Sequence, residues 1–241
     1  MTRRRWIADE CSGDRASLLG KHAEHLARVL RAQVGQTFEI AAGGVVRHGT
    51  VTHVATDRVE FALGEALQHD GEPNIAVALA IFKFDRFEWA IEKLVELGAA
   101  SILPFAAARS DSHLLSAAAK RVERWRRVAL SASEQSRRAA PPEIQQVAQF
   151  REVLGAAAAA RIVLSEAARA EQGLSGVVRG AELRGGDRLL IAIGPEGGWT
   201  AGELEQFEKN GWKAASLGAS ILRAETAAIA ATAIALSEMS K

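Results

Sequence analysis

One segment of the chain combines an apolar run with a glycine-rich turn, an arrangement in which backbone groups can touch a ligand. Leu189–Ile193 is wholly apolar, and Gly194–Gly198 reads Gly-Pro-Glu-Gly-Gly. Five apolar residues in a row are typical of a parallel strand covered on both faces. Thr200 and Glu203 then have the spacing of a helix capping box. The segment predicts a strand, a loop and a helix, and such loops at strand carboxyl ends bind ligands in open α/β sheets.

The composition of this loop restricts the ligand. The loop contains neither the Gly-x-Gly-x-x-Gly dinucleotide motif nor the Gly-x-x-x-x-Gly-Lys phosphate-binding motif. It carries Glu196 at its tip, and a carboxylate there opposes the anions that helix N-termini attract. The loop therefore favours a neutral or locally cationic ligand. A tight strand-to-helix turn without any ligand is the alternative.

A second group of polar residues lies near the C-terminus. Arg223, Glu225 and Thr226 stand at the start of a predicted last helix. An arginine in a first helical turn opposes the helix dipole by up to ~1 kcal/mol, so Arg223 calls for a phosphate or for Glu225 as its partner. Beyond them, 227–236 contains only alanine, threonine, isoleucine and leucine, which predicts burial on more than one side, within the chain or against a second subunit.

The strongest local charge imbalance lies between Arg109 and Arg138, where eight residues are basic and three are acidic. Apolar residues at helical spacing predict a long amphipathic helix over about 115–138. Arg121, Arg124 and Arg127 fall on a different face from that apolar stripe. Such a face is either simply solvated or binds the phosphates of a nucleic acid.

Bulk properties set limits on the function. The 241 residues carry a net charge of +1, so any nucleic-acid surface must be a local patch. Cys11 is the only cysteine and the six histidines are scattered, which predicts neither a disulfide nor a structural metal site. No apolar stretch approaches the ~20 residues that cross a bilayer, and the N-terminus does not resemble a secretory signal. We therefore expect a cytoplasmic protein that binds neither membrane nor metal.

Two regions differ in their periodicity. Residues 1–70 contain short β-like runs, with Gly43 and Gly44 as a predicted hairpin turn. The polar stretch 69–74 predicts a linker. Residues 74–241 alternate between apolar strands and amphipathic helices, which predicts a mostly parallel sheet with helices on both faces.

Five sequence blocks together resemble the ribosomal RNA small subunit methyltransferase E family. The resemblance covers nearly the whole chain, and its blocks are Ile193–Gly198, Leu217–Ala227, His25–Arg31 with Val34-Gly35, Glu92–Gly98, and Glu134–Ser136 with Arg138 and Pro142–Ile144. The chain departs from the family at Ala139 and Ala140, where asparagine and arginine are common. This departure shifts the expected polar role onto Glu134, Gln135 and Arg138.

The resemblance implies a fold and an activity. The fold is α/β: a SPOUT-type trefoil-knot methyltransferase domain over 74–241, preceded by a small PUA-like RNA-binding β-barrel over 1–70. The activity is methyl transfer from S-adenosylmethionine to N3 of a uridine in bacterial 16S rRNA, either free or in the assembled small ribosomal subunit. The resemblance also implies a homodimer. Two alternatives are a related methyltransferase acting on tRNA or a ribose 2′-hydroxyl, and a non-catalytic RNA-binding or ribosome-assembly protein.

The resemblance and the residue chemistry together nominate three sets of site residues. The expected cofactor-binding residues are Leu164, Ser165, Glu166, Ile193, Gly194, Pro195, Glu196, Gly197, Gly198, Leu217, Gly218, Ile221, Leu222, Arg223, Thr226 and Ala227. For catalysis, Arg223 or Arg138 would support negative charge on the uracil, and Glu225 or Glu134 would accept its proton. The expected RNA-binding residues are Arg3, Arg4, Arg5, Arg109, Arg121, Arg124, Arg127 and Arg138.

Overall fold

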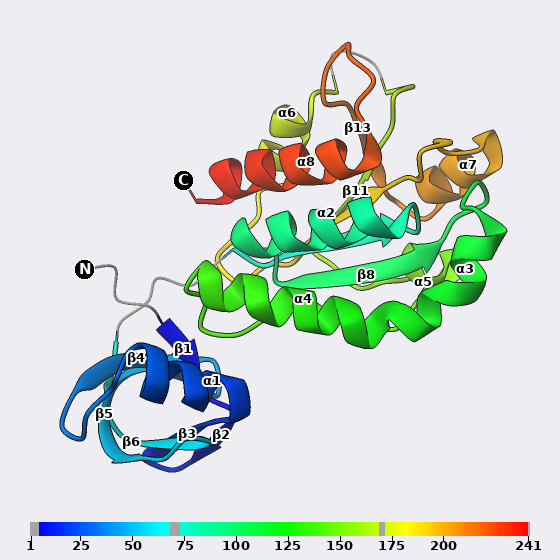
Figure 1. Ribbon diagram of the computed structural model, residues 1–241. Coiled ribbons are helices and arrows are strands. Elements are labelled where there is room, and N and C mark those ends of the chain that lie inside the picture. Colours follow the sequence, from blue (N-terminus) through cyan, green and yellow to red (C-terminus); the bar gives the residue numbers. More distant parts are fainter. Residues whose placement is uncertain (1–4, 68–72, 169–171, 241) are drawn as a thin grey trace. The chain divides into compact units, whose positions relative to one another are not determined.

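The computed structural model describes residues 5–67, 73–168 and 172–240 (Figure 1). The chain forms two compact units. Unit 1 comprises Met1–Asp70 with Leu130–Pro141, and unit 2 comprises Gly71–Ala129 with Pro142–Lys241. Most of the predicted linker, 68–72, lies outside the described residues.

Unit 1 is built on a six-stranded sheet in the order β1-β4-β5-β6-β3-β2. Its strands are β1 Arg5–Ile7, β2 Glu10–Ser12, β3 Arg15–Leu19, β4 Thr37–Ala42, β5 Val45–Val54 and β6 Arg58–Ala66. β1 pairs with β4 in parallel, and the other ladders are antiparallel. The predicted hairpin is confirmed: Gly43 and Gly44 connect β4 to β5 with φ of 58° and 79°, which a type I′ turn requires at both positions.

The core of unit 1 lies between this sheet and a short helical segment. The helices are α1 Gly20–Glu24 and the π-helix η1 His25–Val29. Trp6, Leu18, Leu26 and Phe61 are essentially inaccessible to solvent and belong to one apolar cluster. Part of the His25–Arg31 block is thus structural, because Leu26 anchors the helix to the sheet.

Unit 2 contains a seven-stranded sheet in which every ladder is parallel. Its strands are β7 Ile75–Ala80, β8 Ser101–Ala106, β9 Glu143–Ile144, β10 Ala148–Gln149, β11 Ala160–Leu164, β12 Leu189–Ile193 and β13 Lys213–Ala215. The order is β10-β8-β7-β12-β11-β13, with β9 also paired to β8. The central strands β7 and β12 are buried at every position, which explains their unbroken apolar sequences.

Helices cover both faces of this sheet, as the alternating pattern predicts. They are α2 Phe84–Glu96, α3 Ser112–Ala118, α4 Val122–Gln135, α5 Phe150–Leu154, α6 Leu174–Arg179, α7 Ala201–Lys209 and α8 Ala224–Met239. α8 packs on β7 and β12 and against α2 and α6 (Figure 1). On the opposite face of the sheet, alternate residues of β7 and β12 such as Ala76 and Leu190 belong to an apolar cluster that contains Phe207 and Trp212.

The prediction of one continuous helix over 115–138 is wrong in its details. The 3-10 helix η2, Ala119–Arg121, separates α3 from α4. Asp111 caps α3 by accepting from the amides of His113 and Leu114. α4 ends at Gln135, and Arg137 adopts φ of 61°, the left-handed conformation that commonly stops a helix. Arg138 therefore lies beyond the helix.

Candidate functional site

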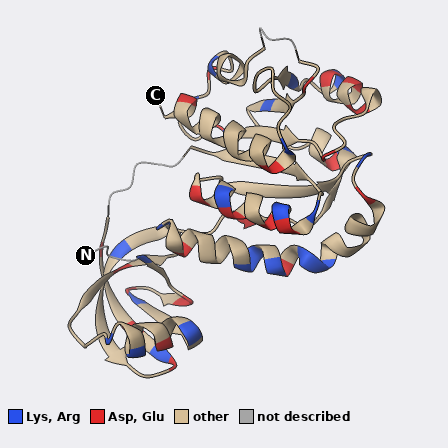
Figure 2. Cartoon of the chain, turned by 45° about the horizontal axis from the view of Figure 1, so that its top comes forward, with Lys and Arg blue, Asp and Glu red and all other residues tan. Residues whose placement is uncertain are grey.

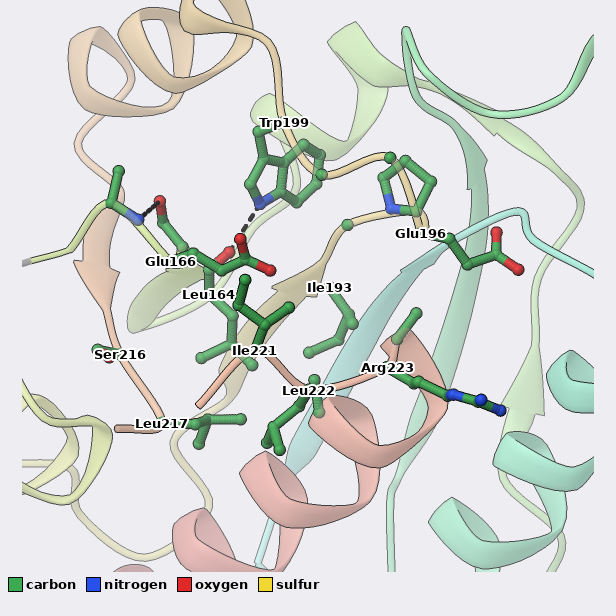
Figure 3. Close-up of a pocket in the computed structure, with 18 of the residues that line it drawn as sticks. Leu164, Glu166, Ile193, Glu196, Trp199, Ser216, Leu217, Ile221, Leu222 and Arg223 are labelled. Atoms are coloured by element: carbon green, nitrogen blue, oxygen red, sulfur yellow. Dashed lines mark hydrogen bonds between the residues drawn. The ribbon is translucent and has the colours of Figure 1, made fainter. Parts of the chain in front are cut away.

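A cavity of about 630 Å³ opens at the carboxyl ends of β11, β12 and β13 (Figure 3). Three loops and the start of α8 form its walls. The loops contribute 164–167 at the end of β11, 193–199 at the end of β12, and 215–218 with 220–224 after β13. Ligand sites of open α/β sheets lie at this edge, so the cavity is where the strand order predicts one.

Trp199 joins two of these loops. Its indole Nε1 donates a hydrogen bond of 2.7 Å to the Leu164 carbonyl oxygen (Figure 3). A Cβ atom on Gly194 would lie 3.1 Å from the Trp199 ring, so glycine allows the β12 loop to pass close to the indole. Gly198 follows with φ of 68°, a conformation that favours glycine.

The capping box at the start of α7 is confirmed, and it also fastens a neighbouring loop. Thr200 Oγ1 accepts from the Glu203 amide at 3.2 Å, and Glu203 Oε2 accepts from the Thr200 amide at 2.8 Å. The second carboxylate oxygen accepts from the Ala108 amide at 2.8 Å. The buried Glu203 therefore holds the loop after β8 beside the loop after β12.

The turn after β13 brings apolar side chains over the cavity. Ser216 Oγ accepts from the Gly218 amide at 3.1 Å, and Gly218 has φ of 118°. Leu164, Ile193 and Ile221 converge in the cavity (Figure 3). Ile221 is 79% exposed, more than any other large apolar residue in the described part of the chain. An apolar surface of this kind beside a cavity fits an aromatic or aliphatic ligand group.

The remaining wall of the cavity is charged. Its charged lining residues are Arg86, Arg109, Arg223, Glu166 and Glu196. Arg109 donates a hydrogen bond of 2.8 Å to the Gly197 carbonyl oxygen, which fixes the guanidinium against the β12 loop. The cavity thus has apolar and glycine residues in its lining together with three arginines and two glutamates.

Comparisons with known proteins place this cavity in a family. Residues 70–236 match the family model described as an RNA methyltransferase domain. Ribosomal RNA small subunit methyltransferase E of Bacillus subtilis is 34% identical over 220 residues, which are 88% of this chain and 85% of that protein. The chain belongs to the ribosomal RNA small subunit methyltransferase E family. The resemblance inferred from the motifs is confirmed.

Other family members extend the comparison. The enzyme of the same name from Mesomycoplasma hyopneumoniae is 34% identical over 167 residues, 68% of this chain and 71% of that protein. The crystal structure of the Neisseria gonorrhoeae enzyme bound to S-adenosyl methionine aligns with a TM-score of 0.78 and 28% identity, over 95% of each chain. These matches confirm the α/β methyltransferase fold.

The structure gathers nearly all of the expected cofactor residues of this family member around the one cavity. The exception is Thr226, an exposed residue of α8 that does not line it. The lining residues that sequence reasoning missed include Arg86 and Trp199. No local signal marks Arg86, because it comes near the β12 loop only through the pairing of β7 with β12.

The four catalytic candidates separate into two places. Arg223 lines the cavity, and Glu225 lies in the first turn of α8 with its side chain 7% exposed. Glu134 and Arg138 belong to unit 1, where Glu134 Oε1 lies 3.1 Å from His22 Nε2. The two glutamates therefore have different partners.

The expected RNA-binding arginines of unit 1 are only partly described. Arg5 forms an ion pair of 3.2 Å with Glu39 and donates to the Arg137 carbonyl oxygen. Arg3 and Arg4 lie outside the described residues.

Basic residues recur along Ala119–Arg121 and α4 (Figure 2). Glu88 of α2 forms ion pairs with two of them. Arg124 binds Glu88 through two hydrogen bonds of 2.7 and 2.8 Å, which raise the pKa of Arg124 above its usual range. Arg121 lies 3.5 Å from the same carboxylate. Arg127 donates to the backbone carbonyl of Glu123 at 3.4 Å. This basic face is therefore partly neutralised.

Two further observations concern metals and membranes. Within residues 5–67, 73–168 and 172–240, no group of three or more histidine, cysteine, aspartate or glutamate side chains is arranged to hold a metal ion. In the same part of the chain, no helix is both long enough and apolar enough to pass through a bilayer.

Proposed function

We propose that this protein transfers a methyl group from S-adenosylmethionine to N3 of a uridine in 16S rRNA, in the cytoplasm where ribosomes assemble. The observation that carries the proposal is the loop-lined cavity of unit 2 in a chain of this family. The Neisseria gonorrhoeae relative with bound S-adenosyl methionine supports the cofactor. The substrate that we propose for the present protein is either the free rRNA or the assembled small subunit.

The residues that line the cavity suit this cofactor chemically. Leu164, Ile193, Leu217 and Ile221 provide apolar surfaces for the adenine ring, and the backbone of Gly194–Gly198 provides donors and acceptors for its edge. Glu166 and Glu196 are the acidic residues of the lining, and a carboxylate suits the positive sulfonium. The bound cofactor supplies an electrophilic methyl group.

The protein must then prepare the uracil. N3 of uracil loses its proton, forms a bond to the methyl carbon as the carbon–sulfur bond breaks, and so becomes N-methylated. The negative charge that develops spreads over the two uracil carbonyl oxygens. Arg223 lines the cavity at the N-terminus of α8 and supports this charge.

The architecture belongs to the same proposal. We infer a trefoil knot in the loops that follow β12 and β13, and a PUA-like RNA-binding role for the sheet of unit 1. The knot is supported by family membership and by the strand order, in which β12 lies between β7 and β11. The mixed six-stranded sheet supports the comparison with a PUA-like barrel.

A homodimer packed around α8 is also part of the proposal. Ala230, Ala233 and Ile234 are apolar yet only partly buried, so the helix retains an apolar face that a second copy can cover. Ile234→Glu would bury a charge at a cost of several kcal/mol if the face is covered. Sedimentation should show a dimer for the unmodified protein and a monomer for Ile234→Glu. A monomer with full activity would contradict the dimer.

A methyl-transfer assay separates the proposed function from its alternatives. The purified protein is incubated with isotopically labelled S-adenosylmethionine and with small subunits, free 16S rRNA or tRNA from cells lacking the gene. We expect label in N3-methyluridine of 16S rRNA. Label in tRNA or in a ribose 2′-hydroxyl would support a related methyltransferase. Absence of cofactor binding in calorimetry would support a non-catalytic RNA-binding protein.

A further inference from the structure

The three arginines of the cavity come from segments that are distant in sequence. Arg86 belongs to the first turn of α2, Arg109 to the loop after β8, and Arg223 to the N-cap of α8. These segments follow strands β7, β8 and β13, so their meeting is a product of the parallel sheet. S-adenosylmethionine has one carboxylate, one ammonium group and one sulfonium, so it does not require three guanidinium groups. The charged lining residues are three arginines and two glutamates, a net charge of +1, and an arginine that the cofactor does not need can bind a second, anionic ligand group in the same cavity.

Arg86 forms an ion pair with the buried carboxylate of Glu225. Arg86 Nε lies 3.7 Å from Glu225 Oε1, and their side chains are 32% and 7% exposed. Glu225 Oε2 is buried and has no hydrogen-bond partner among the described residues. A buried carboxylate is costly unless it is paired, and Arg86 is the cation beside this one. We infer that Glu225 orients Arg86.

Arg86 keeps donor capacity for a ligand. Among the described residues, no hydrogen bond from its guanidinium to another side chain or carbonyl is seen, and the contact with Glu225 involves Nε. A guanidinium has five N–H donors in a planar fork, so one face can contact Glu225 while the terminal groups meet a planar acceptor. Arg86 lines the cavity together with Gly194 and Arg223. It is therefore placed to contact whatever ligand approaches the cofactor.

We propose that Arg86 is a uracil-binding residue that stabilises the N3-deprotonated ring, and that Glu225 is its positioning residue. This inference rests on the proposed function. When the N3 proton leaves to water, the charge spreads onto a carbonyl oxygen of the planar ring, which a guanidinium can bind through charge-assisted hydrogen bonds. Glu225 thereby acquires an orienting role in place of the proton-accepting role that the sequence suggests. A phosphate of the RNA is the competing ligand.

The test compares Arg86→Ala, Arg86→Lys and Glu225→Gln with a matched control pair. Arg179 and Glu238 supply that pair, because Arg179 Nε also lies 3.7 Å from a glutamate of α8 whose side chain is 10% exposed. Arg179→Ala and Glu238→Gln thus remove the same kind of contact away from the cavity. Calorimetry measures S-adenosylmethionine and uridine 5′-monophosphate binding for each variant. Methyl transfer to small subunits is measured against pH at saturating cofactor.

For Arg86→Ala, we expect cofactor affinity within about twofold of the unmodified protein and kcat lower by ~10²-fold or more, the size of effect seen when one charge-stabilising donor is removed. The rising limb of the pH profile should move to higher pH, because the uracil proton is then harder to remove. Uridine monophosphate binding should weaken. Arg86→Lys should recover part of kcat. Glu225→Gln should move the rising limb of the pH profile to higher pH, by less than Arg86→Ala does. The two control variants should change neither kcat nor the position of that limb.

Three outcomes would overturn the assignment. A higher KM for RNA with an unmoved pH limb in Arg86→Ala would make Arg86 a phosphate anchor. Loss of cofactor affinity in that variant would make the Arg86–Glu225 contact a structural support of the cavity. Full activity in Arg86→Ala would show that the residue has no role. If the unmodified protein transfers no methyl group to uridine, the proposed function itself fails, and the cofactor and nucleotide binding data show which part is wrong.

Discussion

Unit 2 contains two groups of three arginines that face different surroundings. The cavity group is Arg86, Arg109 and Arg223, and the helical group on η2 and α4 is Arg121, Arg124 and Arg127. In the helical group, Glu88 binds Arg124 through both carboxylate oxygens and also lies near Arg121. In the cavity group, Arg86 lies 3.7 Å from a buried carboxylate, and the residue lines a cavity.

The comparison shows that charge density along a sequence is a poor guide to where charge acts. The helical group stands out in the sequence because its arginines are close together, but α2 supplies a neutralising carboxylate from elsewhere. The cavity group does not stand out, because three separate segments contribute one arginine each. The fold, and not the local sequence, decides which cations remain available to a ligand. Four substitutions test this difference between the two groups of arginines.

The largest effect is expected from closing the cavity itself. A Cβ atom on Gly197 would lie 3.2 Å from Arg109 Cβ, so Gly197→Val must displace the loop or the arginine. We expect S-adenosylmethionine binding to fall by more than ~100-fold, about 2.7 kcal/mol or more, as measured by calorimetry. Gly185→Val is the matched control, since a Cβ atom there meets no other atom within 4 Å. Normal affinity in Gly197→Val would show that the ligand binds elsewhere.

A large effect is also expected from Arg223, which lines the cavity without a polar partner among the described residues. Arg223→Ala should lower kcat by ~10²-fold, because a preorganised charge next to the reacting base is lost. Arg151→Ala, on α5 and outside the cavity lining, should leave kcat unchanged. Equal rates for the two variants would remove the distinction between cavity arginines and surface arginines.

A smaller effect is expected from the helical group. Replacing Arg121, Arg124 and Arg127 together by alanine should weaken RNA binding and reduce the slope of log K against log salt. Three phosphate contacts would reduce that slope by up to about 0.9 each, and pairing with Glu88 should keep the change below this limit. The measurement is RNA affinity at several salt concentrations. An unaltered slope would mean that this face is only solvated.

The smallest effect is expected from Glu88. Glu88→Gln keeps the size of the side chain and releases Arg124 from its ion pair. If the helical arginines meet phosphate, RNA affinity should rise by a few fold and the salt slope should steepen by up to about one contact. Glu123→Gln, which removes a carboxylate paired with Arg126, is the control for added net charge. An equal gain in both variants would assign the effect to net charge alone.

Local chemistry allowed much of this site to be predicted from sequence. The capping box of Thr200 and Glu203, the Gly43-Gly44 turn and the buried β12 strand each depend on neighbouring residues, and the structure contains all three. The sequence also nominated 16 of the 24 residues that line the cavity.

The features that were missed depend on distant parts of the chain. Arg86 enters the cavity because β7 pairs with β12, a register that periodicity does not reveal. Glu88 of α2 neutralises part of the positive charge on α4, although it precedes its partner Arg124 by 36 residues. The grouping of Leu130–Pro141 with unit 1 is likewise invisible to local patterns, since α4 begins in unit 2.

The most direct test of the central claim is nucleoside analysis of small-subunit rRNA from cells in which this gene is deleted, with the gene restored as unmodified protein or as Gly197→Val. We predict that N3-methyluridine disappears from 16S rRNA on deletion, returns with the unmodified protein and stays absent with Gly197→Val. N3-methyluridine that persists at its full level after deletion would contradict the account.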